Sequence, residues 1–221
     1  MKLKKADLNN SPYLGIYSYT NDDFCLVPNT IDEKEQKILE EMLDTKIINT
    51  TVNQSSLLGV YLVGLGNKLI VNEDSIRSSE LEFLEKEGFN IKLIKDYNAL
   101  GNLISVNKNY GFASTLLSEE TVKEISKFLN IEIERRNCAG IDLPGSSIYV
   151  NDNLFLVNPN VSDDDFEYML NKFKVPGVAT TINYGGSFVG NDVIGNKNAL
   201  LVGSSTSNIE LMAVDNIIVD M

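Results

Sequence analysis

The stretch Ala99-Leu100-Gly101-Asn102-Leu103-Ile104-Ser105-Val106 combines a glycine near its start with an alternating apolar run. The turn-prone Asn107-Lys108-Asn109 and the apolar Phe112-Ala113 follow, so the pattern predicts a β-hairpin. Four other glycines precede similar runs, at intervals of 42 to 45 residues, and twelve positions after each of the five comes a small apolar residue. The five glycines are Gly15, Gly59, Gly101, Gly145 and Gly190, and the residues that follow them are Val27, Val71, Ala113, Val157 and Val202.

The first of these units shows the predicted order of elements. We expect a strand over 14–19, a turn over 21–23 and a return strand over 24–27. Thr30-Ile31-Asp32-Glu33 resembles a capping box and predicts the start of a helix, which a third strand over 46–49 follows. Each unit is therefore expected to be ββαβ, and Lys2-Leu3-Lys4 is a candidate for a closing strand.

The other units repeat this order with different residues. Their first strands are expected over 58–63, 99–106, 146–150 and 190–194. Their helices are expected to start at Ser78, Ser118, Ser162 and Ser207, and further third strands are expected over 91–94 and 131–133.

A single ββαβ unit cannot bury both its sheet face and its helix stripe, so neighbouring units must cover each other. The sequence therefore predicts an α+β fold, a β/α-propeller in which five repeats close into a pseudo-fivefold ring. Residues 1–221 would form one domain, with 1–13 as a lead-in and units of approximately 14–53, 54–98, 99–140, 141–185 and 186–221. A β-propeller is the alternative repeat fold, but its blades have four strands and no amphipathic helix.

Composition excludes several classes of function. The net charge is −12 without a dense basic stripe, so phosphate backbones and anionic membranes would be repelled. This acidity has two interpretations: it serves only to keep the protein soluble, or it is complementary to the charge of a basic protein partner. No apolar run approaches 18 residues, and the Met-Lys-Leu-Lys-Lys start has no apolar signal segment, so a cytoplasmic protein is expected.

The two cysteines, Cys25 and Cys138, are too few and too far apart in the sequence for a disulfide framework, and no histidine is present to complete a metal site. We interpret both as buried or half-buried strand thiols. No metal and no cofactor is expected.

Several short sequence motifs resemble those of a known family. They are Thr20-Asn21-Asp22-Asp23-Phe24-Cys25-Leu26-Val27, Ser56-Leu57-Leu58-Gly59, Ala99-Leu100-Gly101-Asn102 and Ser204-Ser205-Thr206-Ser207-Asn208-Ile209-Glu210-Leu211. At their places in the five-unit pattern they resemble the translation initiation factor 6 family, whose fold is the pentein ring. The resemblance spans nearly the whole chain, and the end soon after the fifth unit is similar to the archaeal members.

The resemblance implies a factor without chemistry of its own. Members of that family bind the intersubunit face of the large ribosomal subunit, block joining of the small subunit and act in large-subunit maturation. The partner it implies is a basic large-subunit protein near the sarcin-ricin loop, with release by a maturation protein and a translation-type GTPase. A monomer is expected.

Six ribosome-binding residues follow from the resemblance, position by position: Leu58, Val60, Gly101, Asn102, Ser146 and Ser147. The residue after each repeat glycine varies between units, so the repeat itself cannot require it. Asn102 presents an amide that could bind a partner's backbone or satisfy a local turn. The glycines themselves permit close approach, either between units around the axis or by a partner.

Two departures from the family bear on this surface. Many relatives carry a polar or charged residue where Val60 stands, so a charged contact there is expected to be lost. The segment Asp142-Leu143-Pro144-Gly145-Ser146 is also about two residues shorter than in familiar archaeal members, which would shift that part of the rim. In the fifth unit, the loop Gly185-Gly186-Ser187 is expected to be flexible enough to adapt to a partner surface.

Two other functions remain open. The pentein ring also hosts guanidine-modifying enzymes, but these need a cysteine nucleophile and a histidine base, and this chain contains no histidine. We therefore expect no enzyme activity. A ring that binds a non-ribosomal partner is the second alternative, and it predicts no selectivity for large subunits.

Overall fold

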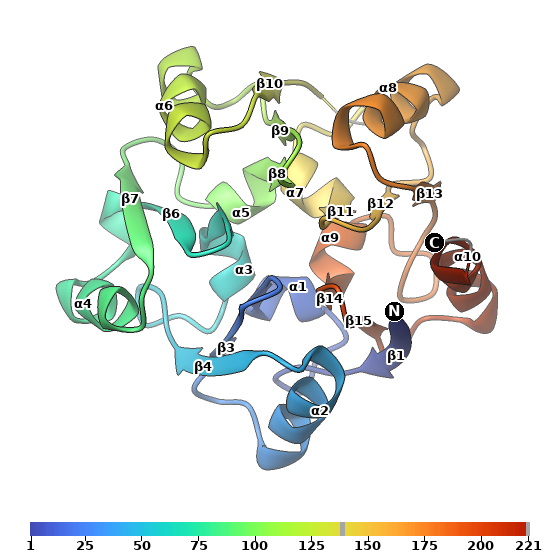
Figure 1. The fold of residues 1–221 in the computed structure, drawn as a ribbon, viewed down its shortest axis with the longest axis horizontal. Coiled ribbons are helices and arrows are strands. Elements are labelled where there is room, and N and C mark those ends of the chain that lie inside the picture. The colour runs from blue at the N-terminus through green and yellow to red at the C-terminus, as the bar shows by residue number, and fades with distance from the viewer. Residues whose placement is uncertain (138–139, 220–221) are drawn as a thin grey trace.

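The computed structural model describes residues 1–137 and 140–219 and shows five similar units around one axis (Figure 1). In each unit a short helical turn near the axis leads into a three-stranded sheet, and a longer helix lies on the outside. This arrangement confirms the predicted ring of five ββαβ repeats.

The elements of each kind share one position in every unit. The central helical turns are α1 (Leu14–Tyr17), α3 (Leu58–Tyr61), α5 (Leu100–Leu103), α7 (Pro144–Ser147) and α9 (Val189–Asp192). The outer helices are α2 (Glu33–Leu43), α4 (Ser78–Lys86), α6 (Glu119–Leu129), α8 (Asp163–Phe173) and α10 (Asn208–Val219), and the second unit adds the 3-10 turn η1 (Glu73–Ser75).

In every sheet the second strand is central, antiparallel to the first and parallel to the third. The first four sheets are β2 (Tyr19–Thr20), β3 (Phe24–Pro28) and β4 (Lys46–Thr50); β5 (Val63–Leu65), β6 (Lys68–Asn72) and β7 (Asn90–Ile94); β8 (Ile104–Val106), β9 (Gly111–Ala113) and β10 (Ile133–Arg135); and β11 (Ile148–Val150), β12 (Phe155–Val157) and β13 (Gly177–Ala179). The fifth combines β14 (Val193–Gly195) and β15 (Ala199–Gly203) with the N-terminal β1 (Lys2–Ala6).

The N-terminal strand closes the ring. Strand β1 pairs in parallel with β15, from Lys2 opposite Ala199 to Ala6 opposite Gly203. Strand β1 at the start of the chain and α10 near its end therefore both belong to the fifth unit (Figure 1). The closing role predicted for Lys2-Leu3-Lys4 is confirmed.

The predicted first strands were wrong at their beginnings. The repeat glycines lie in the four-residue helical turns, and each first strand starts only after the turn. A turn this short gives no helical periodicity, so the sequence pattern resembled a longer strand.

Close packing of these turns explains the glycines. A Cβ on Gly59 would overlap the carbonyl oxygen of Gly15, and one on Gly101 would overlap that of Gly59, in both cases well inside 3.0 Å. The same holds for each glycine against the preceding one, and Gly15 meets Gly190 to complete the circle. Of the two predicted explanations, close approach between units is thus confirmed.

Side-chain caps mark the start of the outer helices other than α4, whose N-cap residue Arg77 makes no such bond. Ser118 and Ser162 cap α6 and α8 as predicted, whereas α2 is capped by Asp32, with Glu35 completing the capping box, so the start predicted at Thr30 was two residues early. The strand predicted over 131–133 lies at Ile133–Arg135, because Asn130 in a left-handed conformation ends α6 and the chain needs further residues to reach β9.

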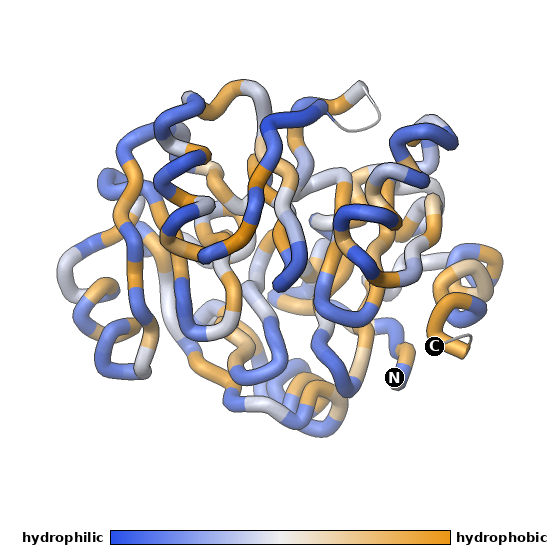
Figure 2. The backbone as a smooth tube through the Cα atoms, turned by 45° about the horizontal axis from the view of Figure 1, so that its top comes forward, coloured by the Kyte–Doolittle hydropathy of each residue, from blue (hydrophilic) through white to orange (hydrophobic). Residues whose placement is uncertain are grey.

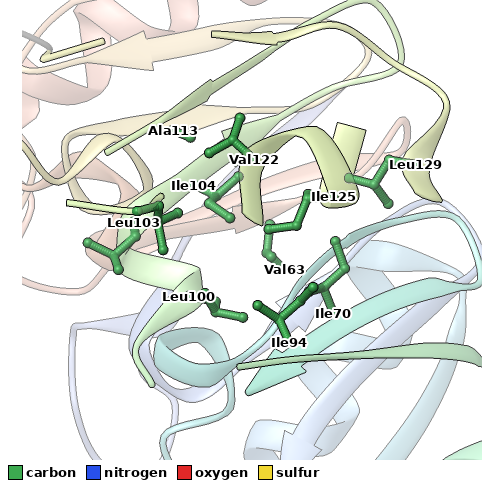
Figure 3. Packing of buried hydrophobic residues seen from close by; sticks show 11 residues of the cluster. Val63, Ile70, Ile94, Leu100, Leu103, Ile104, Ala113, Val122, Ile125 and Leu129 are labelled. Atoms are coloured by element: carbon green, nitrogen blue, oxygen red, sulfur yellow. The ribbon is translucent and has the colours of Figure 1, made fainter. Parts of the chain in front are cut away.

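Each outer helix is packed between its own sheet and the sheet of the preceding unit. In the cluster of Figure 3, Val122 and Ile125 of α6 lie against Val63 and Ile70 of the second sheet and Ile104 of the third. Hydrophobic residues recur along the strands, whereas hydrophilic residues dominate many turns and the outsides of helices (Figure 2). Cys25 is buried in β3 as predicted, and Cys138 lies outside the described residues.

Candidate docking face

The two sides of the ring are built from different parts of each unit. One side, which we call the entry face, consists of the segments that lead into the central helical turns, residues 7–13, 51–57, 95–99, 140–143 and 180–188. The other side, the hairpin face, consists of the turns between the first and second strands. The predicted docking residues lie at or just after the entry segments.

Three entry segments form similar turns, and the turn of the fifth unit is one residue longer than the other two. Each is closed by an isolated β-bridge: Leu8 to Ser11, Val52 to Ser55, and Ile182 to Gly186. At the tip, two consecutive residues take positive φ angles, a conformation that most side chains disfavour. The pairs are Asn9 and Asn10, Asn53 and Gln54, and Asn183 and Tyr184.

In each of these three units, a glutamate near the start of the outer helix accepts hydrogen bonds from the turn. We call this contact a clasp. Glu80 accepts hydrogen bonds from the Asn53 and Gln54 amides, each at 2.8 Å, and from the Thr51 hydroxyl at 2.6 Å. Burial alone would raise the pKa of Glu80, but these bonds and one from the Arg77 amide outweigh it and lower the pKa.

Glu210 holds the turn of the fifth unit in the same way. It accepts from the Thr181 hydroxyl and from the amides of Tyr184, Gly185 and Ser207, at 2.6 to 3.1 Å. Although burial opposes ionisation, these donors lower the pKa of Glu210 to about 2. In the first unit Glu35 accepts one such bond, from the Asn10 amide at 2.8 Å.

The third and fourth units replace this clasp with other contacts. In the segment before α5, Asp96 accepts from the Thr121 hydroxyl at 2.7 Å and from the Ser118 amide at 3.2 Å. In the segment before α7, Asp142 accepts from the Thr115 amide at 2.8 Å. In each unit a carboxylate therefore binds the described entry segment to its surroundings, but the entry face is not fivefold symmetric.

Exposed aromatic side chains gather on this face. Among the described residues the exposed aromatics are Tyr13, Phe83, Tyr97, Tyr184 and Phe188, and all but Phe83 belong to entry segments. The Asp96 carboxylate accepts from the Tyr97 amide, and the Glu210 carboxylate accepts from the Tyr184 amide. Exposed aromatics above carboxylates suit a protein partner that is basic.

The six predicted docking residues divide into two groups. Leu58 is buried in the core, and Ser146 and Ser147 are only 2% and 0% exposed. Val60, Gly101 and Asn102 are partly exposed. A partner can therefore meet the side chains of Val60 and Asn102 and the backbone of Gly101, and their docking role stays a prediction.

Ser147 has a structural role in α7. Its hydroxyl donates to the Leu143 carbonyl at 2.8 Å, and its own carbonyl accepts from the Asn158 amide at 2.9 Å. Ser146 and Ser147 thus lie in a helical turn, whereas the sequence predicted a strand from residue 146 onward.

Sequence interpretation missed the clasping glutamates and the exposed aromatics. A repeated signal was present: Thr50-Thr51-Val52-Asn53 and Thr180-Thr181-Ile182-Asn183 share a pattern. Each is followed 27 residues after its asparagine by the glutamate that binds its turn, Glu80 or Glu210.

The hairpin face surrounds a hollow on the axis. This cavity has a volume of about 300 Å³ and is lined by the ring glycines, by Tyr19 and Tyr149, and at its mouth by Asp22, Asp23 and Asp152. Asparagines in the turns link neighbouring units: Asn21 donates to the Gly66 carbonyl at 2.8 Å and Asn196 to the Leu43 carbonyl at 2.8 Å.

The thiol that the structure describes is poorly suited to catalysis. Cys25 is fully buried beside the Thr20 hydroxyl, and burial raises the pKa of its thiol to about 12. Residues 1–137 and 140–219 hold no cluster of three or more His, Cys, Asp or Glu that could bind a metal. In the same residues, no helix has the length and apolar character to span a membrane.

Comparison with known proteins identifies sequence relatives along the whole chain. A model of the eIF-6 family matches residues 3–217. The chain is 32% identical over 215 residues to translation initiation factor 6 of Picrophilus torridus, covering 97% of this chain and 98% of that one. It is 30% identical over 222 residues to the protein of the same name from Pyrococcus horikoshii, covering 97% of both.

Among solved structures, the fold is similar to the N-terminal domain of an ArgZ variant, crystallised with a covalently bound reaction intermediate. The TM-score is 0.55 at 11% sequence identity, covering 85% of this chain and 75% of that one. This likeness concerns the fold alone.

Proposed function

The chain belongs to the eIF-6 family, and we propose that it binds the large ribosomal subunit at its intersubunit face and prevents the small subunit from joining. Its relatives are translation initiation factors, and membership of their family points to a role in translation without catalysis. We further propose that it acts as a monomer in the cytoplasm, during large-subunit maturation as well as in keeping subunits apart.

The entry face is the observation that carries this proposal. It presents exposed aromatics beside carboxylates, in a chain with a net charge of −12. Such a face fits a basic protein better than a phosphate backbone. The proposed partner is a basic large-subunit protein near the sarcin-ricin loop, with a maturation protein and a translation-type GTPase removing the factor.

Asn102 is the proposed centre of the contact. It lies in α5 beside the backbone of Gly101, is partly exposed, and offers donors and acceptors in one plane. Val60 occupies the equivalent place in α3, where an apolar contact would replace the charged one of many relatives.

Co-sedimentation tests the proposal. The protein is mixed with isolated archaeal large subunits and, separately, with small subunits at matched salt. Asn102→Lys is compared with Asn67→Lys, which makes the same charge change at an exposed position on the hairpin face. We expect pelleting with large subunits only, weakened about five- to 150-fold by Asn102→Lys and unchanged by Asn67→Lys.

Two results would count against the proposal. Pelleting with neither subunit at low and moderate salt would leave a ring with a non-ribosomal partner. Binding to large subunits that Asn67→Lys weakens more than Asn102→Lys would assign docking to the hairpin face.

A further inference from the structure

Tyr184 is the most exposed large hydrophobic side chain among the described residues, at 84%. It also has a φ of 62°, in the left-handed region that is a genuine outlier for a bulky residue. A strained residue that the surrounding structure holds in place is a reason to look for a function.

The surrounding structure does hold this turn. Glu210 binds the Tyr184 and Gly185 amides, at 3.1 and 2.8 Å, and the Asn183 side chain donates to the Pro12 carbonyl of the first unit at 2.8 Å. The backbone beneath Tyr184 is thus fixed on both sides, while the ring itself projects into solvent. The flexibility predicted for the Gly185-Gly186-Ser187 loop stays a prediction.

The repeats show that the fold does not need an aromatic here. At the corresponding tip position, the first and second units carry Asn10 and Gln54, also with positive φ. Asparagine accepts this conformation readily, and both turns are clasped by a glutamate like that of the fifth unit. The reason for a tyrosine at position 184 is therefore its exposed ring, which a partner can contact, and not packing within the fold.

From these observations we infer that Tyr184 is an aromatic anchor for a basic protein surface, inserting its ring against a lysine or arginine side chain of the partner. The inference rests on the proposed function, since it takes that partner to belong to the large subunit. A tyrosine face attracts a cation, and tyrosine is enriched among the residues that dominate binding. The Glu210 carboxylate beneath the turn and the net charge of −12 favour a basic protein over RNA.

Three variants of the full chain test the inference in the co-sedimentation assay. Tyr184→Asn introduces the residue that the first unit carries at this position, and Tyr184→Phe keeps the aromatic face. Met212→Asn removes another exposed hydrophobic side chain, in α10 and outside the entry segments. We expect Tyr184→Asn to weaken binding to large subunits about tenfold or more, and the other two to bind like wild type.

Thermal unfolding separates an anchor from a packing residue. Tyr184→Asn should unfold at the wild-type temperature or above, because asparagine relieves the left-handed strain. A clearly lower unfolding temperature would show that Tyr184 stabilises the fold, and would overturn the inference.

The remaining outcomes are equally decisive. If wild type binds large subunits and Tyr184→Asn binds as well, the inference fails while the proposed function stands. If wild type binds neither subunit, the proposed function fails and the anchor fails with it. Binding to protein-free large-subunit RNA that depends on Tyr184 would assign the ring to base stacking and overturn the basic-protein target.

Discussion

The entry face and the hairpin face use their side chains in opposite ways. On the hairpin face, turn asparagines use their hydrogen-bonding groups inside the ring, as Asn21 does with Gly66 of the next unit. On the entry face, buried glutamates satisfy the backbone from below, and aromatic side chains such as Tyr184 are left free to project. A repeat protein can thus make one face for assembly and keep the other for a partner.

Both faces depend on the ring of glycines, so the largest effect is expected from Gly59→Ala. The added methyl group would overlap the backbone carbonyls of Gly15 and Ser18, which cannot rotate away. We expect a loss of about 4 kcal/mol or more in the free energy of unfolding, or failure to fold. Urea denaturation measures it.

The matched control is Gly66→Ala in an open hairpin turn. Its Cβ would meet nothing within 4 Å, so only the strain of φ +54° remains, and a loss of about 1 to 2 kcal/mol is expected. Equal losses for the two variants would contradict the account of the ring.

Glu80→Ala removes a clasp from the entry face alone. Three amides and the Thr51 hydroxyl would lose their acceptor, and we expect a loss of about 3 kcal/mol. Glu82→Ala, at an exposed position of the same helix, should change stability by less than about 0.5 kcal/mol. Chemical denaturation of both variants checks the difference, and a Glu80→Ala variant as stable as Glu82→Ala would argue against the clasp.

Asn107→Ala makes the corresponding change on the hairpin face. The buried Asn107 amide donates to the Asn151 and Phe173 carbonyls, and its oxygen accepts from two turn amides. We expect a loss of about 2 kcal/mol in stability with binding to large subunits unchanged for the folded fraction. Weaker binding by folded protein would show that the two faces are not independent.

The smallest effect concerns Asp192, which is 2% exposed beneath the turn of the fifth unit. Burial raises its pKa to about 6, with the Asn183 side chain opposing the shift and the charge of Glu210 adding to it. Because the folded pKa lies above the ordinary 3.8, the ionised carboxylate destabilises the fold above pH 6, and this penalty is relieved as the pH falls towards 4.

Asp192→Asn should therefore stabilise the protein by about 1 to 2 kcal/mol at pH 7.5 and give no gain near pH 4. Thermal unfolding across this pH range measures the difference, and a gain that is larger at pH 4 than at pH 7.5 would have the wrong sign.

The sequence was most informative about the fold where the signal repeats. Five evenly spaced glycines predicted the ring, the apolar faces predicted the outer helices, and Lys2-Leu3-Lys4 predicted the closing strand. The central helical turns could not be recognised, because four residues are too few for a period of 3.6 to appear. Ser146 and Ser147 followed from the family resemblance, and the structure shows that both are buried.

The candidate site was only partly accessible to sequence reasoning. Asn102 and Val60 could be singled out because they follow a repeat glycine but vary between units. The importance of Tyr184 could not, because it depends on a left-handed turn and on a glutamate 26 residues away. Hydrogen bonds across such distances leave no local pattern unless two units are compared.

An electron cryo-microscopy structure of the protein bound to archaeal large subunits tests the central claim most directly. We predict that the entry face lies against the subunit, with Asn102 and Tyr184 in contact with a basic ribosomal protein and the axial cavity facing solvent. A complex in which the hairpin face or the outer helices form the contact would contradict the account.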